Sequence, residues 1–226
     1  MRSDQAKGDI LAEAYRRSRG PVAYLDESYQ VPDPNNPGAK TFYLFSAVVV
    51  ERDAMAELRV GLRRIAGSTW WHTTAALQHA EGQRRTRDML SFLADGFEAC
   101  VIAHRIPVSV HDHTAEEARR ACYRGLATDL TTEIPGEWAP VELIVLEERN
   151  TMNLRGKDKK NHNELVAEKL IPRNARLLQT SPGIERLLWL PDLVSAAYRR
   201  TITHRDHTRT LFDLISQQVR FVQPIE

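Results

Sequence analysis

Cysteine is scarce in this sequence, and neither sign of charge dominates it. Only Cys100 and Cys122 occur among the 226 residues, and they lie too far apart to form a metal-binding or redox motif. Two isolated cysteines are typical of a reducing compartment, so we expect a cytoplasmic protein. The formal net charge is +1, so any binding to nucleic acid must depend on a local basic patch.

Long apolar segments and repeats are also missing. No apolar run approaches the roughly 20 residues that span a bilayer, so we expect no membrane contact. The first residues lack the apolar core of a secretory signal. We find no internal repeat, no low-complexity tract and no pattern that predicts an oligomeric state.

The composition is that of an ordinary globular protein. Hydrophobic residues make up 42% of the chain and charged residues 27%, and this length suits one domain. We expect residues 1–226 to form that single domain, with a helical appendage at 1–20, a core at 22–201 and a closing helix at 204–226. Gly20 and Pro21 end the appendage, because this pair does not continue a helix.

Alternating helices and strands predict a mixed α/β core. Residues 22–27 and 41–51 are apolar, and one loop joins them, so they predict an antiparallel hairpin. Crossover helices between the later strands make those strands parallel to a neighbour. Residues 149–162 have the composition of a polar, basic loop. The periodicity predicts helices at 54–66, 81–94, 114–132 and 184–201, and further strands at 97–110, 141–146 and 175–179.

Two of the predicted strands end in acidic pairs. Asp26 and Glu27 close the first strand, and Glu147 and Glu148 follow the apolar run at 141–146. Ligand sites in open α/β sheets form at the carboxyl ends of strands, so these acids converge if the strands are parallel neighbours. A third acid, Asp192, interrupts an apolar helix. Converging carboxylates repel one another and suit a hard cation, Mg²⁺ or Mn²⁺.

The same acids also have simpler interpretations. Asp26 can begin the loop after its strand, where Asp is common. Asp192 can occupy the first turn of a helix that begins at Pro191, where the helix dipole stabilises a carboxylate. If the carboxylates instead hold two ions about 4 Å apart, they form the usual clamp for in-line phosphoryl displacement.

Three stretches together resemble the bacterial family known as domain of unknown function 3800. YLDES followed by FYLFSAVVV is similar to the family's opening strands, ELIVLEERN to its middle strand, and LLWLPDLVSAAYRR to its closing helix. The similarity spans residues 22 to about 200, nearly the whole chain. It implies a ribonuclease H-like fold: a mixed sheet, with an antiparallel hairpin start and parallel later strands, flanked by helices.

The resemblance implies metal ligands at Asp26, Glu147 and Asp192. Glu147 stands where the family more often has Asp, so the distance to a metal is different there. Pro191 replaces the family's usual small residue beside the helix acid. The supporting carboxylates are Glu27, Glu148 and, by analogy with ribonuclease H-like nucleases, Glu81.

Histidines and basic residues complete the expected site. The segment WWHTTAALQHAEGQ resembles the family's histidine-bearing segment, and either His72 or His79 can be the residue that assists proton transfer. A basic run follows the second acidic pair and would hold a phosphate backbone if it lies beside the acids. Its members are Arg149, Arg155, Lys157, Lys159 and Lys160.

These features predict a metal-dependent, nuclease-like phosphodiesterase, a hydrolase that cleaves nucleic acid by a two-metal mechanism with Mg²⁺ or Mn²⁺. The sequence does not distinguish DNA from RNA as its partner. The alternative is a ribonuclease H-like module without catalysis, which binds a protein or nucleic-acid partner. Glu147 in place of Asp, and Pro191, favour that alternative.

Overall fold

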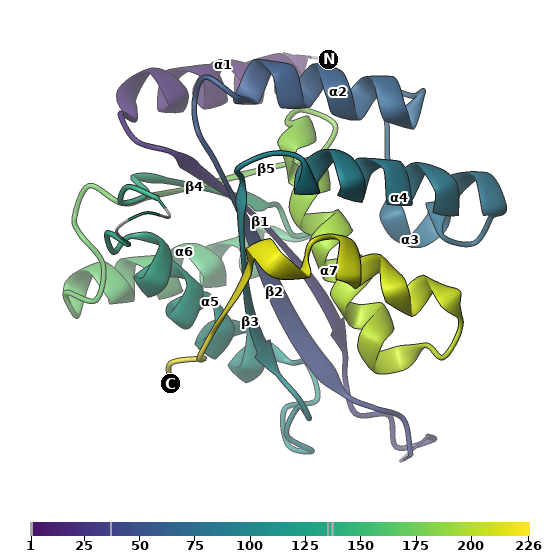
Figure 1. Ribbon diagram of the computed structural model, residues 1–226. Coiled ribbons are helices and arrows are strands. Elements are labelled where there is room, and N and C mark those ends of the chain that lie inside the picture. The colour runs from purple at the N-terminus through teal and green to yellow at the C-terminus, as the bar shows by residue number, and fades with distance from the viewer. Residues whose placement is uncertain (1, 37, 135, 137) are drawn as a thin grey trace.

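A six-stranded mixed sheet forms the centre of the protein (Figure 1). The structure, a computed structural model, describes residues 2–36, 38–134, 136 and 138–226. The strand order is β5-β4-β1-β2-β3-β6. The strands are β1 (Val22–Gln30), β2 (Phe42–Val50), β3 (Ala99–Arg105), β4 (Leu143–Glu147), β5 (Arg176–Thr180) and β6 (Val219–Val222).

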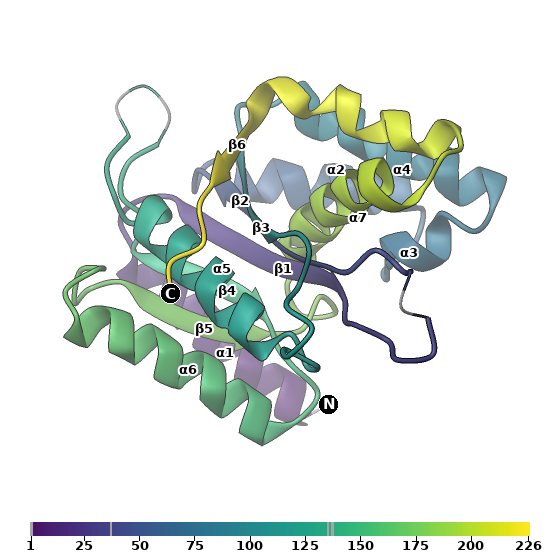
Figure 2. The same cartoon turned by 90° about the horizontal axis from the view of Figure 1, so that it is seen from below.

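Helices cover both faces of the sheet (Figure 2). We call the side under α5 and α6 the α5 face, and the side under α2, α4 and α7 the α7 face. Among the described residues, no helix is long and apolar enough to cross a membrane. The α-helices are α1 (Arg2–Arg17), α2 (Met55–Ala66), α3 (Thr73–Ala76), α4 (Ala80–Ala94), α5 (Glu116–Leu130), α6 (Met152–Ala167) and α7 (Trp189–Thr203); the 3₁₀ helices are η1 (Arg186–Leu188), η2 (His207–Leu214) and η3 (Ser216–Gln218).

The strand directions confirm the predicted mixed sheet. β1 and β2 form the antiparallel hairpin, while β4 is parallel to both β1 and β5. β6 is parallel to β3. β3 is antiparallel to β2, because the intervening helices return the chain to the end of the sheet at which β2 stops.

Alternation along the two central strands divides their side chains between the faces. In β1, Val22 and Tyr24 pack in the cluster of the α7 face, whereas Ala23 and Leu25 pack on the α5 face. In β4, residue 145 packs on the α7 face, and residues 144 and 146 pack on the α5 face. Because this alternation continues, the next side chains, Asp26 and Glu147, point toward α7.

Two predicted segments are different in the structure. Residues 149–162 are not a loop: most of them belong to α6, which Thr151 caps by accepting a hydrogen bond from the Leu154 amide at 3.3 Å. Its buried face carries Asp158, Asn161 and His162, so the apolar periodicity of a helix is missing from the sequence. Residues 204–226 are not one helix either, because the segment forms η2 and η3 and then joins the sheet as β6.

The first strand is also longer than predicted. β1 continues to Gln30, because its ladder with β2 extends to the pair Gln30–Phe42. Asp26 therefore lies inside a strand and does not begin the loop. Turn-forming residues are concentrated only after this extension, which explains why the composition places the strand end too early.

Two glycines test the corrected structure of residues 149–162 and 204–226. Gly156 lies in the interior of α6 with nothing within 4 Å of an added Cβ, so Gly156→Ala should raise the free energy of unfolding by about 0.5–1 kcal/mol. Gly125 lies on α5 beneath the C-terminal segment, where an added Cβ meets the Gln223 carbonyl oxygen at 2.2 Å. Gly125→Ala should lower that free energy by about 1–3 kcal/mol.

Urea unfolding of the three proteins measures both effects. A destabilising Gly156→Ala would contradict the helical assignment of residues 152–167. An unchanged Gly125→Ala would contradict the packing of the C-terminal segment on α5.

Candidate active site

Four of the predicted acids line one cavity. Asp26, Glu27, Glu147 and Asp192 contribute to a hollow of about 380 Å³, and Asp26, Glu147 and Asp192 do so on the α7 face. The register pairs Leu25 with Leu146 in parallel strands, so the next residues, Asp26 and Glu147, lie side by side. The expectation that these two acids end up on adjacent parallel strands is thereby confirmed.

The cavity forms where the two central strands differ in length. The ladder between β1 and β4 ends at Leu25 and Leu146, whereas the ladder between β1 and β2 continues to Gln30. Beyond Asp26, β1 therefore remains paired with β2 but is no longer paired with β4. Asp26 stays 9% exposed at the floor of the hollow that results.

Buried hydroxyl groups fix α7 against the sheet beside Asp26. Ser46 is the cross-strand partner of Asp26 in β2. Its Oγ donates to the Pro191 carbonyl oxygen at 2.8 Å and lies 2.7 Å from Ser195 Oγ. Proline is tolerated in the first turn of a helix, so Pro191 does not disturb the geometry of α7 at Asp192. Ser46 thus sets the position of that turn relative to β1.

Asp192 is held from its other side by α3. Its Oδ2 accepts hydrogen bonds from the Thr73 amide at 2.9 Å and from Thr73 Oγ1 at 2.8 Å. The Trp71 indole nitrogen donates to the same hydroxyl oxygen at 3.0 Å. Asp192 lies in the first turn of α7 and is partly exposed, as its simpler interpretation predicts, and it also lines the cavity.

The carboxylates perturb one another strongly. Burial, followed by the charges of Asp192 and Glu147, raises the pKa of Asp26 well above its usual value. Burial and the Asp192 charge also raise the pKa of Glu147, while its hydrogen bond with Asp26 opposes that rise. Both shifts favour the protonated form of these carboxyl groups, and their causes place the hydrogen bond between Asp26 and Glu147 on the side of a proton at Asp26.

The donor set has the chemistry of a divalent-cation site. Its ligands are carboxylate oxygens, which Mg²⁺ and Mn²⁺ prefer, and their mutual repulsion is what a cation relieves. Within the described ranges, no group of three or more His, Cys, Asp or Glu side chains is arranged to hold a metal ion. Asp192 instead accepts two hydrogen bonds from Thr73.

The supporting acids have other partners. Glu27 also lines the cavity, but it pairs with Arg119 and accepts a hydrogen bond from Tyr43. Glu148 pairs with Lys7 and with Arg155. Glu81 is exposed on α4 and pairs with two arginines of its own helix; it does not line the cavity.

The structure distinguishes the two histidines by position. His72 lines the cavity and caps α3, where its Nδ1 accepts a hydrogen bond from the Ala75 amide at 3.2 Å. Glu147 lines the same hollow. His79 precedes α4, is exposed and does not line the cavity.

The basic run does not reach this cavity. Arg149 and Lys157 pair with Glu116, and Lys160 lies 4.0 Å from a carboxylate oxygen of its own helix. Arg155 pairs with Glu148, and Lys159 borders a different cavity between α1 and β5. The sequence neighbours of the second acidic pair are thus directed along α6 and away from Asp26.

Several cavity residues were not predicted from the sequence. Arg199 lies seven residues after Asp192, two turns along the same side of α7, and this spacing could have indicated it. Its guanidinium donates to Ser28 Oγ at 3.3 Å and to Thr74 Oγ1 at 3.0 Å. Trp70 and Trp189 also line the hollow, and no sequence signal separates them from ordinary core tryptophans.

Comparisons with known proteins give one distant structural likeness. No family model matches the chain, and no curated protein matches it. The structure is similar to the crystal structure of a glutamine-to-alanine mutant of Bst-RNase HIII, with 12% sequence identity and a TM-score of 0.43. The match covers 84% of this chain, and the chain spans 56% of that structure's length. A likeness at this level carries no conclusion about activity.

The raised pKa of Asp26 predicts a pH-dependent effect of Asp26→Asn. The folded protein keeps a proton there at pH values at which the unfolded chain has lost it. The free energy of unfolding of the parent should therefore fall as the pH rises from about 4, the ordinary Asp pKa, through the raised value. Asparagine does not titrate, so the variant should gain stability relative to the parent over that range.

Chemical unfolding of both proteins at a series of pH values measures this difference. The exposed Asp53, replaced by Asn, is the control, and its offset from the parent should stay nearly constant. A constant offset for Asp26→Asn as well would contradict the raised pKa.

Proposed function

We propose that the protein is a metal-dependent phosphodiesterase of the ribonuclease H-like type that cleaves nucleic acid. The observation that carries this proposal is the convergence of Asp26, Glu147 and Asp192 in one cavity. Two of these acids come from adjacent parallel strands, and the third comes from a helix that is hydrogen-bonded to the neighbouring strand. Sites at the carboxyl ends of parallel strands are the usual ligand sites of open α/β sheets.

The three carboxylates would hold the cations, Mg²⁺ or Mn²⁺. Bound divalent ions supply Lewis-acid activation of water and stabilise the charge on the leaving oxygen of a phosphodiester. For the acids to act as ligands, the proton shared by Asp26 and Glu147 has to leave. Thr73 would hold Asp192 in position, and Ser46 would hold the Pro191 carbonyl group beside it.

Two further side chains have positions that suit phosphodiester cleavage. Arg199 is a cation at the same cavity, and its hydrogen bonds go to hydroxyl groups, so its charge is available to a phosphate. His72 lines the same hollow as Glu147 and suits proton transfer to or from the leaving group.

One observation favours the non-catalytic alternative. Asp26 and Glu147 are bonded to each other, and the described residues offer no preformed metal group. A module that binds a partner without a metal would keep this hydrogen bond. Titration with Mn²⁺ separates the two functions, because only the enzyme has to exchange the shared proton for an ion.

Melting temperatures with and without Mn²⁺ test the proposal. An ion that binds the folded state stabilises it by about 2.7 kcal/mol at a hundredfold excess over its dissociation constant. The parent should therefore melt higher in Mn²⁺, whereas Asp26→Asn and Asp192→Asn should lose most of that increase. Glu81→Gln removes a carboxylate outside the cavity, so this control should keep the full increase.

The outcomes separate the assignments. A parent without any response to Mn²⁺, and without Mn²⁺-dependent cleavage of oligonucleotides, would favour the binding module. An increase in Asp192→Asn equal to that of the parent would remove Asp192 from the metal site. Loss of cleavage in Asp26→Asn together with retained folding would support the assignment of Asp26.

A further inference from the structure

Exposed aromatic rings stand at the rim of the carboxylate cavity. Trp70 is 59% exposed and stacks on His72, with ring centroids 6.0 Å apart and an interplanar angle of 7°. Tyr29 is 51% exposed and stacks on Tyr43 at 5.7 Å. Trp70, His72 and Tyr29 all line the hollow that contains Asp26. Each exposed ring is thus held in a fixed orientation by a second ring behind it.

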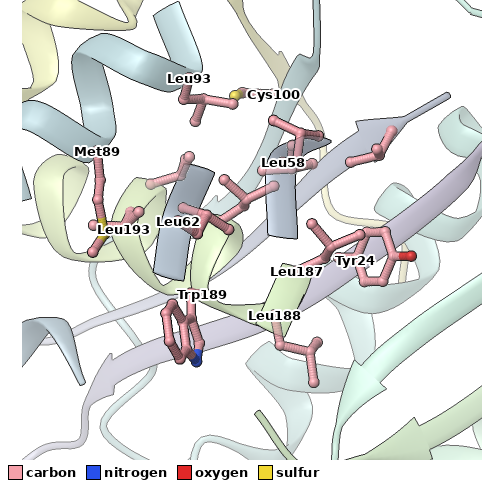
Figure 3. Packing of buried hydrophobic residues seen from close by; sticks show 14 of the residues in the cluster. Tyr24, Leu58, Leu62, Met89, Leu93, Cys100, Leu187, Leu188, Trp189 and Leu193 are labelled. Carbon is pink, nitrogen blue, oxygen red and sulfur yellow. The ribbon is translucent and has the colours of Figure 1, made fainter. Parts of the chain in front are cut away.

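The wall of the cavity also contains a donor without a partner. Trp189 is 1% exposed, and its indole nitrogen has no hydrogen-bond partner in the part of the chain that the structure describes. Figure 3 shows this nitrogen directed away from Leu62 and Leu193, the core residues packed above the ring. Buried polar groups are nearly always hydrogen-bonded, so this indole nitrogen is an exception in the cavity wall.

A cation completes the arrangement. Arg199 lines the same hollow, and its Nε has no hydrogen-bond partner among the described residues. Its other nitrogens donate only to the hydroxyls of Ser28 and Thr74. A phosphate would accept from this guanidinium more strongly than the hydroxyls do, because the bond would join two charged groups.

The size of the hollow limits the ligand. A volume of about 380 Å³ lies near the lower end of the roughly 300–1,000 Å³ of ligand cavities. It suits one nucleotide rather than the width of a double helix. Aromatic faces bind bases by stacking, and in a duplex those base faces are already occupied by their neighbours.

We propose that the cavity takes one unpaired nucleotide of a single-stranded nucleic acid, whose base stacks on Trp70 and whose phosphate binds Arg199. Because this nucleotide lies over the carboxylates assigned to cleavage, the substrate class rests on the proposed function. DNA and RNA strands share this chemistry, and separate probes distinguish them.

Binding of labelled oligothymidylate, oligouridylate and a blunt DNA duplex to the full chain in EDTA tests the proposal. Fluorescence anisotropy should give a dissociation constant for at least one single strand that is about tenfold or more below that for the duplex. Trp70→Ala should weaken single-strand binding by roughly 5- to 150-fold, the range for one stacked base, while Trp70→Phe should retain most of the affinity. Phe97→Ala removes a fully exposed aromatic residue outside the cavity and should leave binding unchanged.

An abasic nucleotide and a charge variant sharpen the test. In the parent, one abasic position in the strand should weaken binding; in Trp70→Ala it should add little, since the stacking partner is already lost. Arg199→Gln should reduce the slope of the logarithm of affinity against the logarithm of salt concentration by about 1, and Arg63→Gln on α2 should not.

The outcomes distinguish a failure of the nucleotide site from a failure of the proposed function. Single-strand binding through Trp70 without any Mn²⁺-dependent cleavage would support the nucleotide site and contradict the catalytic assignment. Cleavage with equal affinity for strand and duplex, and with no effect of Trp70→Ala, would overturn the nucleotide site alone.

Discussion

The parallel pairing of β1 with β4 is the constraint on which the rest of the site depends. It brings two acidic side chains to the same side of the sheet at neighbouring positions, where burial raises the pKa of both carboxyl groups. A buried carboxylate without compensation is destabilising, so the surrounding structure has to limit the charge. The hydrogen bond between Asp26 and Glu147 does so on the sheet, and the two Thr73 hydrogen bonds do so for Asp192.

The opposite face of the sheet uses a different solution for its charges. There Arg119 is buried on α5 and pairs with Asp158 at 2.8 Å and with Glu27, while Tyr43 bonds to both Arg119 and Glu27. In the cavity, in contrast, Arg199 bonds to hydroxyl groups of Ser28 and Thr74, and Asp192 accepts from Thr73. The two networks thus differ in how their carboxylates are compensated.

Much of the sheet was predictable because its strands follow simple patterns. The apolar runs before Asp26 and Glu147 indicated buried strands, and the two acids were expected to converge if those strands were parallel neighbours. The first part of α6 was not predictable in this way. Its buried positions carry Asp158, Asn161 and His162, and Asp158 pairs with Arg119, so the only buried apolar residue of the helix, Leu165, leaves no hydrophobic period to detect among the described residues.

The remaining differences have equally local causes. β6 was missed because only four residues, VRFV, form it at the end of a segment with helical periodicity, although valine and phenylalanine favour strands. The residues at the rim of the cavity could not be predicted from the sequence for another reason. Trp70 and Arg199 are far apart in the chain, and only the packing of α3 against α7 brings them to one hollow. Residue type alone does not distinguish such side chains from a core tryptophan or a surface arginine.

The double hydrogen bond between Thr73 and Asp192 has a thermodynamic consequence. It joins the carboxylate to the short helix that begins directly after Trp70 and His72, so the order of that segment and the orientation of Asp192 form a single equilibrium. A ligand that orders α3 also orients the Asp192 carboxylate, and a cation that binds the carboxylate changes the order of α3. By reciprocity, the factor by which either ligand changes the affinity for the other is the same in both directions.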